Sequence, residues 1–140
     1  MAARPRYYLD TNVVISVVEG VGRLAETQTR FISGIDGATI AALTSELTLA
    51  ECLVKPFADR NAAAVEAYLL FLNGRRNFPV LPITRDILTV AARLRTELGT
   101  KLPDAIHIAT AEAAECSVFL TNDHGIRLPE AMKLKLWNDM

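Results

Sequence analysis

The stretch YYLDTNVVI at residues 7–15 decides how the rest of the chain is interpreted. Its first three residues are typical of a buried β-strand, and the apolar residues after Asp10 continue as a helix. A strand that passes directly into a helix is the opening unit of an α/β fold with a parallel sheet. Asp10 would then lie at the carboxyl end of a strand, where ligands collect in open parallel sheets.

Strand-like and helix-like runs alternate along the whole chain, without an internal repeat or a low-complexity linker. Pro56 is expected to stop one helix and Gly99 to end another. The alternation predicts one domain, residues 1–140, built as an α/β sandwich with a mostly parallel sheet. Strands are expected at 6–9, 39–43, 78–83 (an edge or irregular strand), 118–121 and 133–137, and helices at 11–18, 24–35, 45–54, 61–72, 86–98 and 103–114.

Three further carboxylates stand at the edges of predicted elements. Glu51 lies in a predicted helix, Asp104 lies in the first turn of another, and Asp123 directly follows a predicted strand. If a parallel sheet gathers these element ends, the three acids and Asp10 meet at one edge. Oxygen-only clusters of this kind suit hard divalent cations such as Mg²⁺ or Mn²⁺.

Each acid also has a purely structural interpretation. Asp10 could cap the helix that follows it, Asp104 could complement its helix dipole, and Asp123 could be a turn residue. Glu51 could be a solvated helix residue. We expect this of Glu46, which lies five residues earlier and therefore about 140° away around the helix. The joint occurrence of four acids in this order favours a functional site.

The composition excludes several classes of protein. The net charge of −1 provides no overall positive field, so local arginines and metal must hold any polyanionic substrate. The apolar run at 62–72 is too short to span a bilayer, and the N-terminus lacks the pattern of a signal peptide. We therefore expect a cytoplasmic protein. Cys52 and Cys116 show no zinc-ligand spacing and form no disulfide framework, so we expect small buried hydrophobes.

The hydrophobic content is high for so small a chain. It reaches 51% of residues, and the mean hydropathy is +0.22. Either the core is well supplied or a partner covers some apolar surface. The apolar stripe in the helix at 61–72 fits both interpretations; its members are Ala63, Val65, Tyr68, Leu69 and Leu72.

The histidines and the basic residues give weaker signals. His107 shares a predicted helix with Asp104, and His124 follows Asp123; we expect both histidines to be packed or supporting rather than ligands. The chain offers no convincing Ser–His–Asp or Cys–His arrangement. Basic residues that either contact phosphates or belong to a solvated face are Arg75, Arg76, Arg85, Lys101 and Arg127.

Four motifs together resemble those of the PIN-domain ribonucleases, most closely the VapC-type toxins of bacterial toxin–antitoxin pairs. They are LDTNVVI at 9–15, TSELTLAE at 44–51, LPDAIHIATA at 102–111 and LTND at 120–123, and the resemblance extends from residue 7 to about residue 137. It implies a three-layer α/β/α sandwich, one or two Mg²⁺ or Mn²⁺ ions, and endonucleolytic cleavage of RNA. The residues that match the family's site are the metal-binding acids Asp10, Glu51, Asp104 and Asp123, the neighbouring hydroxyl residue Thr121, and the polar residue Asn12.

The chemistry of phosphodiester hydrolysis also fits these residues by themselves. Carboxylates alone repel a phosphate, whereas a divalent cation anchors it, lowers the pKa of a bound water and polarises a phosphoryl oxygen. Asp10, Asp104 and Asp123 are the most direct ligand candidates. Glu51 would bind directly or through water, and Thr121 could orient the attacking water.

Two other functions stay open. A phosphatase of the haloacid dehalogenase kind also has an aspartate at the end of its first strand, but normally a second one two residues later, where this chain has Asn12. A non-catalytic binding domain on the same fold would not need the complete set of acids. The preferred interpretation is a metal-dependent endoribonuclease that acts on RNA, with an antitoxin and a second copy of the chain as partners.

Overall fold

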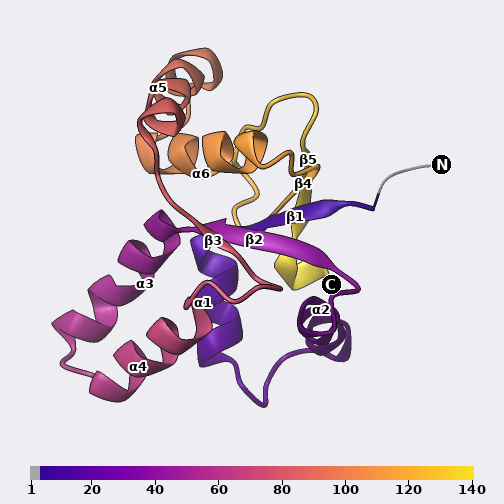
Figure 1. The fold of residues 1–140 in the computed structure, drawn as a ribbon, viewed down its shortest axis with the longest axis vertical. Helices are drawn as coiled ribbons and strands as arrows, with labels where there is room; N and C mark the ends of the chain where they lie inside the picture. Colours follow the sequence, from indigo (N-terminus) through magenta and orange to yellow (C-terminus); the bar gives the residue numbers. More distant parts are fainter. Residues whose placement is uncertain (1–3) are drawn as a thin grey trace.

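A parallel sheet of order β3-β2-β1-β4-β5 organises the computed structural model, which describes residues 4–140 (Figure 1). The strands are β1 (Arg6–Leu9), β2 (Ala41–Ser45), β3 (Val80–Leu81), β4 (Val118–Thr121) and β5 (Lys133–Leu136). The helices are α1 (Thr11–Glu19), α2 (Glu26–Asp36), α3 (Glu46–Ala58), α4 (Ala62–Phe71), α5 (Arg85–Leu98) and α6 (Leu102–Ala113), followed by the short 3-10 helix η1 (Trp137–Asp139).

Helices cover both faces of this sheet. Figure 1 shows α5 and α6 above it and α1 to α4 below it. One core joins α5 and α6 to Tyr8 and Phe119 of the sheet. The other joins α1 to α4 to Leu9 and Leu120, the next residues along the same two strands. Because side chains alternate between the faces of a strand, β1 and β4 supply both cores. The expected three-layer α/β/α sandwich is confirmed.

The pairing of β1 with β4 brings the ends of the two strands together. Leu9 is in register with Leu120, and the backbone N–H of Asp10 donates to the carbonyl of Leu120 at 2.9 Å. All four residues of β4 are buried, so its end at Thr121 is held firmly in the interior. This register places Asp10 and Thr121 side by side at the carboxyl edge of the sheet.

Several predicted boundaries are confirmed and others shift. The α5 helix ends before Gly99, which adopts the left-handed conformation (φ 68°) that ends many helices. The second strand begins at Ala41, two residues later than expected, because the carbonyl of Gly34 accepts from the N–H groups of Thr39 and Ile40 and holds both in the turn after α2. The helix expected at 24–35 begins at Glu26.

The prediction that Pro56 stops the third helix is wrong. The α3 helix continues to Ala58, and Pro56 is buried within its last turn. A proline lacks the N–H that would bond four residues back, and its ring crowds that carbonyl. Only two helical residues follow Pro56, so few helical hydrogen bonds depend on the backbone beyond it. Burial of the proline ring supports the continued helix.

The predicted apolar stripe on α4 is divided between the core and the surface. Tyr68 and Leu72 are buried in the core below the sheet, whereas Leu69 is about half exposed. The hairpin of α3 and α4 also exposes Phe57 and Leu70. The apolar residues available to a partner therefore include Leu69 of the predicted stripe together with Phe57 and Leu70, which lie outside it.

In the described part of the chain, no helix is both long enough and apolar enough to cross a membrane.

Candidate active site

Asp10 occupies the junction between β1 and α1, where it has two roles. Its Oδ1 accepts the N–H of Thr11 at 2.8 Å and caps α1, as the structural interpretation of this residue predicted. Its Oδ2 accepts from the hydroxyl of Thr121 at 2.7 Å and from the amide of Asn12 at 3.3 Å. The residue is 6% exposed, so a buried carboxylate is fixed by donors from three residues.

Thr121 and Asn12 connect Asp10 to the loop that carries Asp123. The Thr121 hydroxyl accepts from the Asn12 amide at 3.1 Å and from the backbone N–H of Asp123 at 3.0 Å. The Asn12 oxygen accepts the backbone N–H of Asn122 at 2.9 Å. Asp123 also accepts from the N–H of Gly125 at 2.9 Å, so it is a turn residue as well. One hydrogen-bond network therefore fixes both strand ends.

Glu51 reaches the same region from α3. Its Oε1 lies 2.6 Å from the hydroxyl of Thr11 and 2.6 Å from Nε2 of His107. Burial by itself would raise the pKa of Glu51, but the hydrogen bonds from His107 and Thr11 outweigh it, and the pKa lies below the ordinary value. Glu46 is exposed at the start of α3, as expected.

His107 lies beneath these carboxylates and is 1% exposed. Its Nδ1 lies 2.6 Å from the Tyr8 hydroxyl, which lies 2.8 Å from the Ser45 hydroxyl. Because an ionised Glu51 can only accept, Nε2 carries a proton in that pair. Burial raises the pKa of Tyr8, so its phenol stays protonated at neutral pH. His107 is thus a packed, supporting residue, as the sequence predicted.

Asp104 lies half-buried in the first turn of α6. Its pKa is raised, first by burial and then by the negative charges of Asp10 and Asp123, with a smaller contribution from Glu51; His107 opposes the rise. Burial alone would raise this pKa, but the contributions of Asp10, Asp123 and Glu51 arise only because these charges lie near Asp104. The four predicted acids therefore share one electrostatic environment at the carboxyl edge of the sheet.

The donor set of this edge fits a hard divalent cation, although the side chains do not already surround one. Within residues 4–140, no three acidic, histidine or cysteine side chains converge on a single position that could hold a metal ion. The ion pairs made by the four acids in that range involve only His107, which lies 2.6 Å from Glu51 and 3.8 Å from Asp10. Several carboxylates without a lysine or arginine partner are the usual setting for Mg²⁺ or Mn²⁺.

The basic residues predicted near the site do not lie together, and two of them are engaged elsewhere in the fold. Arg85 begins α5 and Lys101 immediately precedes α6, close in sequence to Asp104. Arg75 instead pairs with Asp36 at 3.5 Å, and Arg127 donates to the carbonyl of Leu98 at 3.3 Å. Arg76 lines a cavity beside β2. His124 is exposed in the turn after Asp123.

Three supporting residues were not predicted from the sequence. Thr11 donates to Glu51, Tyr8 contacts His107, and Ser45 contacts Tyr8. Tyr8 and His107 are separated by 99 positions, so no local pattern announces their contact. Thr11 gives the only local signal, because it directly follows the capping Asp10.

Comparison of the fold with solved structures finds neighbours of the VapBC toxin–antitoxin type. The VapBC2 complex of Rickettsia felis, solved with a fragment of its promoter DNA, matches with a TM-score of 0.72 and 17% identity over 94% of this chain and 98% of the other. The DNA-bound VapBC of Salmonella typhimurium matches with a TM-score of 0.67 and 20% identity, over 95% and 98%. VapC20 of Mycobacterium tuberculosis, a toxin that cleaves the sarcin-ricin loop, matches with a TM-score of 0.61 and 16% identity over 85% of this chain and 91% of the other.

Sequence comparison identifies the family independently. No curated protein matches the chain by sequence. The model of the PIN domain, however, matches residues 7–130 and therefore contains all four acids of the site. The structural neighbours, which are complexes and toxins of the VapBC type, share the fold. The chain therefore belongs to the PIN-domain family.

Proposed function

We propose that this protein is a metal-dependent endoribonuclease and the toxin of a toxin–antitoxin pair. The observation that carries the proposal is the gathering of carboxylates at one sheet edge: the Thr121 hydroxyl joins Asp10 to the backbone of Asp123, and Glu51 lies against Thr11, the residue after Asp10. The match to the PIN-domain family and the structural neighbour that cleaves the sarcin-ricin loop support a nuclease whose substrate is RNA.

Asp10, Asp104 and Asp123 would hold Mg²⁺ or Mn²⁺, with Glu51 bound directly or through water. Such an ion supplies Lewis acidity toward a phosphoryl oxygen and lowers the pKa of its bound water. The chain's own groups keep the acids in place. The Thr121 hydroxyl and the Asn12 amide orient Asp10, while His107 and Thr11 hold Glu51 in its ionised form.

The burial of Thr121 bears on the role proposed for it. Its side chain is fully buried, and its hydroxyl contacts Asp10, Asn12 and the N–H of Asp123. These contacts support a positioning role on the carboxylates rather than direct contact with a water in the open site. The mechanism therefore assigns Thr121 to the alignment of Asp10 with Asp123.

The partners are part of the same proposal. The neighbours from Rickettsia felis and Salmonella typhimurium are toxin–antitoxin complexes, which supports an antitoxin for this chain. Apolar side chains exposed on the α3–α4 hairpin support a protein interface, either with that antitoxin or between two copies. Light scattering of the purified chain, alone and co-expressed with the product of an adjacent small reading frame, tests both partners.

The two alternative functions differ in how they fit the site. Membership of the PIN-domain family argues against a haloacid-dehalogenase-like phosphatase, and Asn12, in the place of that class's second aspartate, serves as a hydrogen-bond bridge. A non-catalytic binding domain would retain the fold and need not cut RNA. Activity measurements distinguish it from the nuclease.

The decisive experiment measures cleavage of a labelled RNA with Mg²⁺, with Mn²⁺ and with EDTA. We expect cleavage only with metal, and none from Asp10→Asn, Asp104→Asn or Asp123→Asn. Glu46→Gln is the matched control, because Glu46 lies exposed on another face of the helix that carries Glu51. Cleavage that persists in EDTA contradicts the metal dependence. Turnover of p-nitrophenyl phosphate without RNA cleavage favours the phosphatase.

A further inference from the structure

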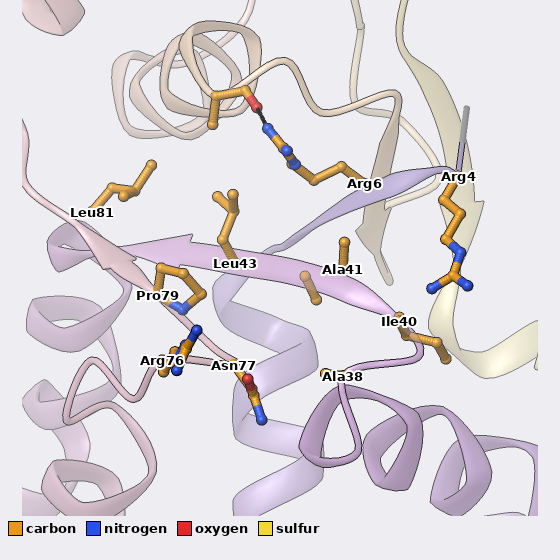
Figure 2. A pocket seen from close by; sticks show the side chains of 12 residues that line it. Arg4, Arg6, Ala38, Ile40, Ala41, Leu43, Arg76, Asn77, Pro79 and Leu81 are labelled. Atoms are coloured by element: carbon orange, nitrogen blue, oxygen red, sulfur yellow. Dashed lines mark hydrogen bonds between the residues drawn. The ribbon is translucent and has the colours of Figure 1, made fainter.

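A cavity beside the edge of β2 contains unpaired positive charge at the end of the sheet remote from the acids. Its volume is about 450 Å³, and Figure 2 shows Arg6 above β2 and Arg76 with Asn77 below it. Arg4 and Arg6 come from the start of β1, whereas Asp10 follows the end of that strand. The cavity is therefore separate from the candidate active site.

The three arginines of this cavity lack acidic partners. In the ion pairs formed within residues 4–140, Arg4, Arg6 and Arg76 do not take part. Arg6 donates through one nitrogen to the carbonyl of Ala114 at 2.6 Å, which leaves its other donors free. The adjacent Arg75 differs, because it pairs with Asp36 and lies 5.7 Å from the ring centre of Phe71. Among the described residues that line the cavity there is no aspartate or glutamate.

On the side away from β1, the first residues of β2 line this cavity and have no strand partner among the described residues. Pairing with β3 begins only at Thr44, whose N–H donates to the carbonyl of Pro79 at 3.1 Å. On the same side of the chain, two residues before Ala42, the N–H of Ile40 donates to the carbonyl of Gly34. Because alternate residues of a strand present their N–H groups to the same side, Ala42 faces the gap between these two bonded positions. An added strand would pair with Ala42.

The lining of the cavity distinguishes between two kinds of anionic ligand. Its apolar part is aliphatic, formed by Leu43, Pro79, Leu81 and Ile40, and the lining residues include no aromatic ring. Proteins that bind single-stranded nucleic acid use aromatic rings on which bases stack. An aliphatic floor flanked by guanidinium groups and beside an open strand edge instead matches a peptide that pairs by its backbone and inserts alternate side chains.

We propose that this cavity binds an extended acidic peptide segment of a partner protein. The segment adds alongside β2 at Ala42, inserts an aliphatic side chain between Leu43 and Pro79, and places its carboxylates on the opposite face, at Arg76. The specificity comes from charge complementarity, since a chain of net charge −1 concentrates three unpaired arginines here. The proposal does not depend on the nuclease activity.

Fluorescence anisotropy with a blocked, labelled peptide of alternating glutamate and valine tests the binding. We expect saturable binding that weakens about two- to fivefold with Arg76→Gln, the size of an exposed ion pair. Arg76 has no partner in the described chain whose loss would disturb the fold. The matched control is Arg75→Gln, in the same loop but already paired with Asp36, which should leave the affinity unchanged. Equal effects of the two substitutions overturn the site.

Three further probes decide what kind of ligand the cavity takes. Replacement of glutamate by glutamine in the peptide should abolish most of the binding, and N-methylation of alternate backbone amides should do the same by removing strand pairing. On peptide addition, amide hydrogen exchange at Ala42 should slow. Undiminished binding of the N-methylated peptide overturns strand addition. A labelled oligouridylate that binds more tightly than the peptide and displaces it identifies a nucleic-acid site and overturns the peptide proposal.

Discussion

Nε2 of the buried His107 lies 2.6 Å from Oε1 of Glu51, and this pair links the carboxylate edge of the sheet to the interior of the protein. Beneath it, the other ring nitrogen of His107 contacts the hydroxyl of Tyr8. Glu51 is about one third exposed, whereas His107 is almost fully enclosed. A change in the core at His107 is therefore transmitted directly to an acid of the candidate site.

Replacing His107 with phenylalanine should destabilise the fold by about 1–3 kcal/mol, because it leaves Glu51 and the phenol of Tyr8 without their partner. Tyr8→Phe, which removes only the hydroxyl, should cost about 0.5–1.5 kcal/mol. Urea unfolding of both variants and of the double variant measures the coupling. Since the two side chains touch, the double variant should lose less than the sum of the two single losses. Strict additivity would show that the contact contributes nothing.

Asp104→Asn and Glu51→Gln should change the pH dependence of stability in opposite directions. The pKa of Asp104 is raised above the ordinary 3.8, so its ionisation costs stability as pH rises through the carboxyl range. Asp104→Asn should therefore stabilise the metal-free protein at neutral pH, and this gain should vanish at pH values below 3.8. The pKa of Glu51 is lowered from 4.5, so its contribution is present above that pH and is lost as pH falls through the folded-state pKa.

Unfolding midpoints of these two variants and the wild type, measured from about pH 3 to about pH 7, check both signs. Glu51→Gln should be less stable than wild type at neutral pH, and the two proteins should converge in acid. Destabilisation by Asp104→Asn at neutral pH would instead assign that residue to the helix dipole, where a negative charge in the first turn is favourable.

Magnesium should raise the melting temperature of the wild type more than that of Asp104→Asn. Binding to the folded state alone adds about 2.7 kcal/mol when the free ion is at about 100 times its Kd. Neutralising a ligand weakens this binding, so the shift should shrink in the variant. Thermal melts of each protein with EDTA and with magnesium provide the comparison. Equal shifts would mean that Asp104 is not a ligand.

Thr121→Val should destabilise the protein by about 1–3 kcal/mol, because it deprives the buried Asp10 of a donor and the N–H of Asp123 of its acceptor. Thr121→Ser keeps the hydroxyl and loses one buried methyl group, at a cost of about 0.8 kcal/mol. RNA cleavage should fall with the valine variant and survive with serine. Similar losses of stability and activity in both variants would remove the hydroxyl from the proposed mechanism.

The sequence alone determined the features that depend on neighbouring residues. An apolar run predicts the strand β4, and two prolines predict the edge position of β3. The tolerance of glycine for the left-handed conformation predicts the end of α5 at Gly99. The order of the four acids also indicated the family and a common edge. The strand, the edge position and the helix end each depend on a few neighbouring residues, and the order of the acids is read directly from the chain, so none of these properties requires the folded structure.

Only the tertiary structure decided which side chains meet. Three features depend on segments that are far apart in sequence. They are the contact of Tyr8 with His107, the raised pKa of Asp104 and the gap beside Ala42. Pro56 shows the same limit, because its local preference to end a helix gave way to burial in the fold. Contacts of this kind depend on the register of β1 against β2 and β4 and on the helices packed over them. That register is set by the simultaneous burial of two cores and not by any one segment.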